Sequence, residues 1–330
     1  MKAGSRQRRG WWRWPSVWGL ALFLAVGLFA PLLANNVPLL ARVGGKWSFP
    51  AFTEYFDSPS PGPNDMSWKQ WWSRLPNDAD DFAVMPPWPY GPAETDAGLA
   101  CAGPCFLHPL GNDDTGRDVL ARLVHGAGTT VGIGGTAVLI AGLLGTLLGA
   151  LAGLRRGFFD GCVQRAIEVV LCFPSLLFFV FAASFFGSSR AALIAVMALM
   201  FWTSFARIVR GELLSLRERD FVLVARGLGI GEWRLLTRHM LPQVTSQIGV
   251  TAAFCMAGAI VGEATLSFLG VGPGQTVTSW GTMLRQGSEQ APVGAWHLWV
   301  FPTAAIVAMV GCCHSLADRL RGRHDAVALA

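Results

Sequence analysis

Stretches without any charged residue alternate along this chain with short segments in which charged residues gather. An α-helix needs about 20 predominantly apolar residues to cross the hydrocarbon layer of a membrane, and most of the uncharged stretches approach or exceed that length. They predict an all-α polytopic membrane protein. The uncharged stretches cover residues 14–41, 123–154, 169–189, 191–206, 239–262, 264–284 and 290–317.

Six transmembrane helices fit this pattern. The stretch at 264–284 is not counted as a further span, because its glycines and Pro273 favour a re-entrant or extracytoplasmic loop. The fourth span is short, since Ala191 to Ala206 has only 16 residues, or about 24 Å of helix. Arginines at its ends would have to extend toward water. The helices are predicted at approximately 15–34, 129–153, 167–186, 191–210, 244–268 and 296–317.

Composition agrees with the pattern. Hydrophobic residues make up 52% of the chain and charged residues 14%, and the mean hydropathy is +0.42, whereas a soluble domain has about a quarter of its residues charged. The net charge of +5 could suggest a nucleic-acid partner. Basic residues beside apolar spans more often record membrane orientation, so membrane lipid and not nucleic acid is the expected partner.

Charge asymmetry predicts the orientation, because Lys and Arg accumulate in cytoplasmic loops. Segments 1–13, 154–168, 207–238 and 318–330 together hold 18 basic and 8 acidic residues, and segments 36–127, 187–190 and 271–295 hold 8 and 12. Both termini should therefore be cytoplasmic. The expected organisation is an N-terminus and first helix (1–35), an irregular external insert (36–127), a five-helix core (128–318) and a cytoplasmic tail (319–330).

The insert contains a pair of cysteines, Cys101 and Cys105, that would lie outside the membrane. A turn at Gly103 and Pro104 could bring them within disulfide distance, although the short separation is geometrically demanding. A metal site formed with His108 is a sharper alternative, but no fourth ligand is evident. The disulfide and two free thiols both remain open.

Motifs for nucleotide binding and catalysis are absent from the sequence. It has no G-x-x-x-x-G-K-[ST], so the chain cannot by itself bind ATP in a P-loop, and no G-x-S-x-G or H-E-x-x-H. Glu263 is the main ionisable residue within a predicted span; it either lines a substrate path or is a hydrogen-bonded residue at a helix end. Glycines between Gly142 and Gly153 favour close helix packing.

The segment 207–242, between the fourth and fifth helices, predicts two short amphipathic helices with a glycine-containing bend. Such helices either dock on a partner protein or rest on lipid headgroups, which the arginines of the segment would also suit. The apolar positions are Phe221, Val224, Ala225 and Leu228 before the bend and Trp233, Leu235 and Leu236 after it.

This segment resembles the cytoplasmic loop of ABC importer permeases, whose pattern is E-A-A-x-x-x-G, nine residues and I-x-L-P. Ala225 matches the second Ala, Gly229 the Gly, and Leu241 and Pro242 the closing pair. Leu223, Val224 and His239 depart from the family's Glu, Ala and Ile. The resemblance implies a type I ABC importer permease fold and a coupling helix, with Leu228 and Trp233 among its apolar residues, that docks on an ATPase subunit.

Further motifs extend the resemblance over roughly 105–325. HPLGNDDTGRDVLARLVHGA (108–127) looks like the segment before the second helix of the smaller permease of dipeptide and oligopeptide importers, with Thr115 as a possible helix N-cap. RAIEVVLCFPSLLF (165–178), GEATLSFLGVGP (262–273), SWGTML (279–284) and SLADRLRGRHD (315–325) match later family segments. NNVPLLARVGGKWSFPAF (35–52) looks like the extended external segment of the microcin C and oligopeptide permease subgroup.

The family implies a non-catalytic subunit of the bacterial inner membrane that moves peptides or peptide-like compounds by alternating access. Its implied partners are a second, unlike permease, ABC ATPase subunits and an extracytoplasmic peptide-binding protein. ATP and Mg²⁺ would bind the ATPase subunits, so no cofactor is expected on this chain. Two other classes of function are less well supported. An intramembrane enzyme would need facing nucleophiles or metal ligands within the spans, and the sequence places none at helical spacing. A channel or ion-coupled secondary transporter would usually show more ionisable residues in its spans, or internal repeats.

Overall fold

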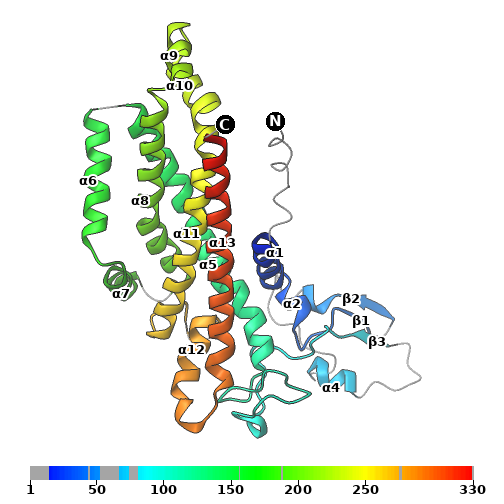
Figure 1. Ribbon diagram of the computed structural model, residues 1–330. Helices are drawn as coiled ribbons and strands as arrows, with labels where there is room; N and C mark the ends of the chain where they lie inside the picture. Colours follow the sequence, from blue (N-terminus) through cyan, green and yellow to red (C-terminus); the bar gives the residue numbers. More distant parts are fainter. Residues whose placement is uncertain are drawn as a thin grey trace, which may run out of the picture. The chain divides into compact units, whose positions relative to one another are not determined.

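A computed structural model describes residues 15–43, 45–52, 67–73, 81–155, 157–186, 189–274 and 277–328, and helices dominate it (Figure 1). Within these residues, four helical segments are long and apolar enough to cross a membrane: Val119–Leu154, Arg190–Leu216, Glu232–Phe268 and His297–Gly322. A bent pair, Phe158–Cys172 with Ser175–Phe181, is a fifth candidate. The prediction of a polytopic helical membrane protein is confirmed in this coarser form.

The first and third predicted spans are interrupted at prolines. Residues 15–34 form α1 (Pro15–Leu28) and α2 (Ala30–Leu33), with Pro31 in the first turn of α2. Residues 167–186 do not form one helix, because α6 (Phe158–Cys172) ends before Pro174 and α7 (Ser175–Phe186) follows at 84°. Proline disfavours helical backbone in the preceding residue, and Phe173 is extended.

The other predicted spans have extended boundaries. α5 (Val119–Leu154) begins ten residues early and α13 (His297–Ala328) ends eleven residues late, whereas α11 (Leu241–Phe268) lies close to expectation. α12 (Trp280–Glu289) and the 3₁₀ turn η5 (Ala291–Val293) occupy the expected loop. α8 (Arg190–Leu216) runs past its predicted end at 210. The helix continues through the charged Arg210, because the Arg210 guanidinium donates two hydrogen bonds to the Asp160 carboxylate of α6, at 2.5 and 2.7 Å.

The chain divides into two compact units made of non-consecutive segments. The first comprises Met1–Leu20, Ile133–Gly274 and Ile306–Ala330, and the second Ala21–Gly132 and Gln275–Ala305. In the first unit, α5, α8, α11 and α13 run side by side (Figure 1). Its main core lies among α5, α6, α7, α8 and α11 and includes Ile133, Met197, Phe205 and Ala259.

Glycines of α5 allow its close packing on α8, as the sequence predicts. A Cβ added at Gly149 would lie 2.5 Å from the Ala206 carbonyl oxygen, and one added at Gly145 would lie 2.7 Å from the Phe205 Cβ. Real side chains do not approach so closely, so larger residues at these positions would push the two helices apart.

The second unit contains a small sheet that the prediction of an irregular insert missed. Strands β1 (Leu40–Val43), β2 (Lys46–Ser48) and β3 (Phe82–Val84) are antiparallel in the order β2-β1-β3. Trp68 and Trp71 of α4 (Trp68–Ser73) pack against the sheet. The short 3₁₀ helix η3 (Ala97–Leu99) precedes the segment that leads into α5.

Candidate functional site: the segment between α8 and α11

The segment between α8 and α11 has the bend that its glycines predict. α9 (Asp220–Gly227) is followed by a turn and α10 (Glu232–Leu235). Gly229, at the turn, has a φ of +77°, a left-handed conformation that glycine adopts without the penalty a Cβ brings. The Ile230 N–H donates to the Ala225 carbonyl at 3.1 Å, which closes the C-terminus of α9.

One side of this segment is buried within the chain itself, contrary to the expectation that its apolar residues lack cover. Leu235 and Leu236, together with Val222, pack in a cluster with Val209 of α8 and Val244 of α11. Ala225 is half-buried against the same cluster. Ala225 therefore supports the position of α9 on its own chain and remains partly accessible, and its role in coupling stays a prediction.

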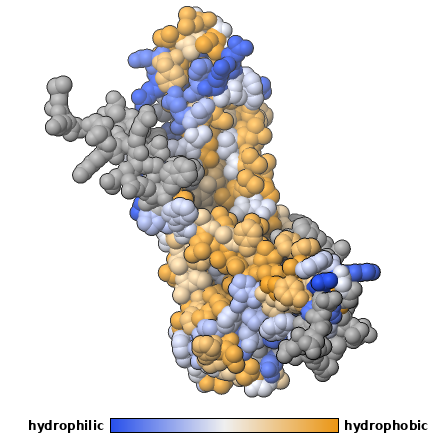
Figure 2. Space-filling view, turned by 90° about the vertical axis from the view of Figure 1, so that its right-hand side faces the viewer, coloured by the Kyte–Doolittle hydropathy of each residue, from blue (hydrophilic) through white to orange (hydrophobic). Residues whose placement is uncertain are grey.

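The other side of the segment is exposed and strongly apolar. Five large side chains form what we call the apolar ridge. In Figure 2, apolar and hydrophilic surface lie next to each other at the top of the view, where Figure 1 places α9 and α10. Exposed apolar groups of this size usually mark a contact with another molecule. The ridge consists of Phe221, Leu223, Val224, Leu228 and Trp233, with exposures of 41, 53, 61, 77 and 60%.

Arg217 connects the segment to the end of α5. Its guanidinium donates to the carbonyl oxygens of Gly153 and Leu154 at 3.2 and 2.8 Å, which are among the carbonyls that a helix C-terminus leaves without intrahelical partners. It also lies 3.9 Å from a carboxylate oxygen of Glu232 in α10. Sequence reasoning did not identify Arg217, because its partners lie more than 60 residues earlier in the chain.

The closing pair of the motif lies where the segment joins α11. The π-helical turn η4 (Leu236–Met240) precedes Leu241, and Pro242 occupies the first turn of α11, where it needs no hydrogen-bond donor. Leu241 is half-buried and Pro242 exposed. The structure thus brings Leu241 beside the buried cluster of Leu235 and Leu236, while Pro242 lies just after the π-helical turn within the continuous helical segment Glu232–Phe268.

An apolar groove of about 670 Å³ runs along α5, α8 and α11 and reaches the segment. Its lining carries no charged side chain. It therefore offers no ionic partner for the charged termini of a peptide, and it suits an apolar helix or acyl chain better. The lining includes Gly142, Leu147, Phe205, Trp233, Leu236 and Leu241.

Glu263 lies in α11 and is fully buried. The Ser267 hydroxyl donates to its Oε1 at 2.7 Å. This contact fits the alternative of a hydrogen-bonded residue near a helix end, and a place for Glu263 in a substrate path stays a prediction. α11 then ends at Phe268, and Gly270 (φ +83°) begins the loop that the glycine-rich sequence predicts.

Cys101 and Cys105 are not joined to each other in the structure, and the disulfide stays a prediction. The backbone holds each of them in other contacts. The Cys101 N–H donates to the Asp113 carbonyl at 2.7 Å, and the Cys105 sulfur accepts the His108 N–H at 3.4 Å. Burial, followed by the charges of Asp114 and Asp113, raises the pKa of Cys101 above 9.0, which keeps the thiol protonated. In the part of the chain that is described, no three potential metal-binding side chains gather.

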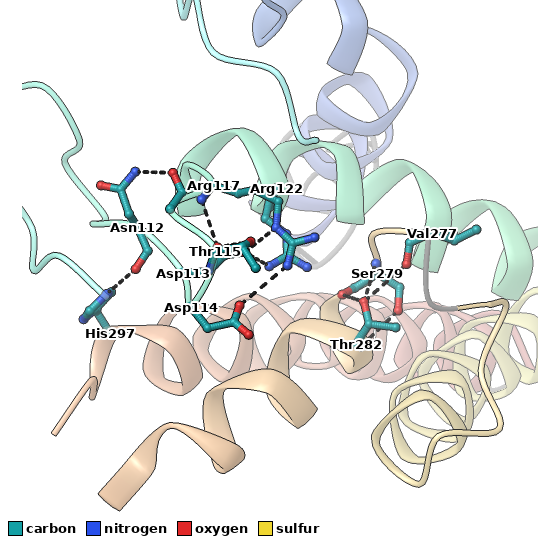
Figure 3. Close-up of polar contacts among 11 residues, drawn as sticks. Asn112, Asp113, Asp114, Thr115, Arg117, Arg122, Val277, Ser279, Thr282 and His297 are labelled. Atoms are coloured by element: carbon teal, nitrogen blue, oxygen red, sulfur yellow. Dashed lines mark hydrogen bonds and ion pairs between the residues drawn. The ribbon is translucent and has the colours of Figure 1, made fainter. Parts of the chain in front are cut away.

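The segment before α5 forms a buried polar network in the second unit, which we call the aspartate network (Figure 3). Asp113 is 2% exposed and accepts from Arg117 Nε at 2.7 Å, from Arg122, and from the backbone and hydroxyl of Thr115 at 2.9 Å. Thr115 is therefore a partner of Asp113 and not the helix N-cap. That role belongs to Asp118, whose Oδ1 accepts the Ala121 N–H at 2.7 Å.

Further contacts tie this segment to other parts of the unit. His108 Nδ1 lies 2.7 Å from Asp118 Oδ2, and the Trp88 indole donates to Asp118 Oδ1 at 2.9 Å. His297, the first residue of α13, lies 3.1 Å from the Asn112 carbonyl. The H-P-L-G-x-D motif was the signal available in the sequence, but its spacing alone does not show which basic residues pair with which carboxylates.

The electrostatics of the network stabilise an ionised Asp113. Burial alone would raise the pKa of this carboxyl group, but the charge of Arg122, the N–H groups of Arg117 and Thr115 and the charge of Arg117 outweigh it and hold the pKa below 3.8. Asp113 is thus an anion at neutral pH, with no proton to transfer. Its role is to position the start of α5.

The SWGTML motif performs a similar structural task at α12. Ser279 and Thr282 form a reciprocal capping box, in which each side chain accepts the other residue's backbone N–H, at 3.2 and 2.9 Å. Trp280 is buried, and its indole donates to the Leu123 carbonyl of α5 at 2.9 Å. Two separate motifs of the sequence therefore meet at the first turns of α5.

Comparison with known proteins identifies the family of the chain. The profile described as "Binding-protein-dependent transport system inner membrane component" matches residues 145–326. A putative peptide permease protein of Brucella suis is 35% identical over 249 residues, which cover 74% of this chain and 82% of the relative.

Two further relatives agree with this assignment. A putative peptide transport system permease protein of Brucella suis is 34% identical, over 72% of this chain and 81% of the relative. A glutathione transport system permease protein of Pectobacterium atrosepticum is 34% identical, over 68% and 74%. The chain is a multi-pass membrane protein that belongs to the family of inner membrane components of binding-protein-dependent transport systems.

Proposed function

We propose that this chain is the permease subunit of an ATP-driven ABC importer of peptides or peptide-like compounds. The names of its relatives, a peptide permease and a glutathione permease, support this substrate class. The observation that carries the mechanism is the apolar ridge on a segment that is firmly packed on its other side. Such a surface can transmit motion from a partner to the helices behind it.

In this proposal an ATPase subunit binds the apolar ridge from the cytoplasm, and both termini of the chain are cytoplasmic. ATP binding closes the ATPase subunits, the α9–α10 segment moves with them, and Arg217 and the buried cluster pass the movement to α5, α8 and α11. A second, unlike permease completes the path, and an extracytoplasmic binding protein delivers the peptide. ATP must favour one of the two conformations over the other for import to occur.

The decisive experiment compares Leu228→Glu with Leu107→Glu. Both leucines are exposed, at 77 and 65%, but Leu107 lies in the loop before α5. Placing a charge within an apolar interface costs several kcal/mol, and about 3 kcal/mol weakens association about a hundredfold. We expect Leu228→Glu to fold normally but to lose co-purifying ATPase and peptide import, and Leu107→Glu to retain the ATPase.

Two results would contradict the proposal. Retention of the ATPase and full import by Leu228→Glu at normal expression would remove the apolar ridge from the coupling interface. Peptide uptake that continues without any ATPase subunit would favour a channel or an ion-coupled secondary transporter instead.

A further inference from the structure

The small sheet of the second unit has one covered and one uncovered face. In β1, Ala41 pairs with Ser48 and Ala83, and this row faces Trp68 and Trp71 of α4, so Ala41 is fully buried. Side chains alternate between the two faces of a sheet. The neighbouring row, in which Arg42 pairs with Trp47 and Phe82, therefore lies on the opposite face.

This opposite face, which we call the aromatic face, is exposed. Trp47, Phe82 and Val84 are 59, 45 and 39% exposed. The Trp47 and Phe82 rings lie edge to face with their centroids 6.4 Å apart, and the Arg42 guanidinium lies over the Trp47 ring at 5.7 Å. The face therefore combines two aromatic rings with a cation for which the described residues supply no carboxylate.

Hydrogen bonds fix the sheet at the end of the first apolar helices. Trp88 exchanges backbone hydrogen bonds with Leu33 and Asn35 on either side of the α2 terminus, both at 3.1 Å, and His125 of α5 lies 2.7 Å from the Ala34 carbonyl. Leu39 N–H then donates to the Val84 carbonyl of β3 at 2.8 Å. The sheet therefore begins directly after the apolar helices α1 and α2.

The sheet follows directly on the first apolar helices. Figure 1 shows α1 and α2 beside the sheet and α4 below it. The last residues of α1 are themselves exposed and apolar, with Leu28 at 62% and Phe29, next in the chain, at 49%. Arg42 and Trp47 of the aromatic face therefore lie within about twenty residues of exposed apolar side chains of the first helices.

We propose that the aromatic face lies on the phospholipid headgroups of the leaflet that surrounds the end of α2. Aromatic rings concentrate at membrane–water interfaces, where an apolar body and a polar edge are both satisfied. An arginine there reaches lipid phosphates while its stem stays in apolar surroundings. The phosphate supplies an anion for Arg42. Contact with lipid then holds the sheet parallel to the membrane and fixes the entry to α5 through His125.

Photo-crosslinking in the assembled transporter tests this contact. The photoreactive aromatic residue benzoylphenylalanine replaces Trp47 or Phe82 in complexes reconstituted into vesicles of phosphatidylethanolamine and phosphatidylglycerol. Trp72 is the matched control, because it is 44% exposed and belongs to α4, on the covered side of the sheet. Leu24, which is 55% exposed on α1, is the positive control for lipid.

The expected result is a mass increase of one phospholipid at positions 47, 82 and 24 and none at position 72. Crosslinking of position 47 to another protein chain would overturn the proposal and identify a docking surface instead. Absence of a lipid adduct at positions 47 and 82 while position 24 reacts would show that the face lies in water. An equal lipid yield at position 72 would show that the contact is not specific to the aromatic face. None of these outcomes depends on whether the chain imports peptides.

Discussion

The aspartate network and the α9–α10 segment sort their side chains in opposite ways. In the network, charged groups are buried: Asp113 and Arg122 are 2 and 3% exposed, and each finds its partner within the same unit. In the segment, apolar groups are exposed although Leu235 and Val222 beside them are buried. Both arrangements cost free energy unless a partner is present. The difference indicates that the buried charges of Asp113 and Arg122 are paired within this chain, whereas the apolar ridge needs another chain.

The largest expected effect is the loss of folding when the network is broken. Asp113→Ala leaves Arg122 buried without its carboxylate, and breaking such a pair costs about 3–5 kcal/mol. Asp114→Ala is the control, because Asp114 lies 3.7 Å from Arg117 with 30% of its side chain exposed, and exposed pairs contribute about 0–1 kcal/mol. Thermal unfolding of the purified protein should separate the two variants clearly. Equal unfolding midpoints would mean that the network contributes nothing to stability.

A smaller effect, confined to coupling, is expected at the bend of the segment. A side chain at Gly229 meets no atom within 4 Å, so any effect of substitution comes from the backbone, where a left-handed conformation costs about 1–2 kcal/mol. ATP hydrolysis stimulated by loaded binding protein should fall strongly in Gly229→Val and much less in Gly229→Asn, since Asn tolerates this conformation.

Gly231 provides the control for the bend. A side chain added at Gly231 would also meet no atom within 4 Å, but the φ of Gly231 is −62°. Gly231→Val should therefore retain the stimulation of ATP hydrolysis by loaded binding protein. If Gly229→Val and Gly231→Val behave alike, the left-handed turn is not what positions the apolar ridge.

A third, weaker effect is expected where the segment contacts α5. Arg217→Gln removes a charged donor from the Gly153 and Leu154 carbonyls, a loss of about 1 kcal/mol. Arg219→Gln removes an equal charge from an exposed position two residues later. Import at constant ATP hydrolysis should fall in Arg217→Gln alone. Equal import by both variants would exclude Arg217 from the transmission of motion.

The helices were predictable because uncharged stretches of membrane-spanning length permit few alternatives. Their interruptions had signals that the apolar pattern concealed, since Pro174 separates α6 from α7 and Pro31 lies at the start of α2. The sheet was missed for a different reason. Its strands have three or four residues each, although the pair Gly44–Gly45 between β1 and β2 is typical of a hairpin turn.

The sequence predicted where the candidate site lies in the chain, but not which of its residues are buried and which are exposed. Spacing identified Gly229 and the apolar residues around it, and the φ of Gly229 confirms the bend. Spacing could not show that Ala225, Leu235 and Leu236 pack on α8 and α11 while Leu228 and Trp233 remain exposed. That division depends on contacts between helices far apart in sequence. The pairing of Arg122 with Asp113, nine residues apart, depends instead on the local turn through Gly116, at φ +80°, which the motif spacing does not reveal.

The smallest effect expected near neutral pH is the dependence of the unfolding temperature on pH that Asp113 contributes. Its pKa in the folded protein lies below 3.8, so its ionisation stabilises the fold fully above that value, and this contribution is lost as the pH falls through the folded pKa. Unfolding temperatures should therefore not depend on Asp113 between about pH 5 and about pH 8, and should fall only in stronger acid. Asp113→Asn should have a lower unfolding temperature at neutral pH, because Arg122 loses its anion, and the difference from the native protein should narrow in acid. If the difference in unfolding temperature between Asp113→Asn and the native protein stays constant down to the lowest pH at which the protein folds, the Asp113 charge does not stabilise the network. The network would then differ from the α9–α10 segment in packing and not in the pairing of buried charges.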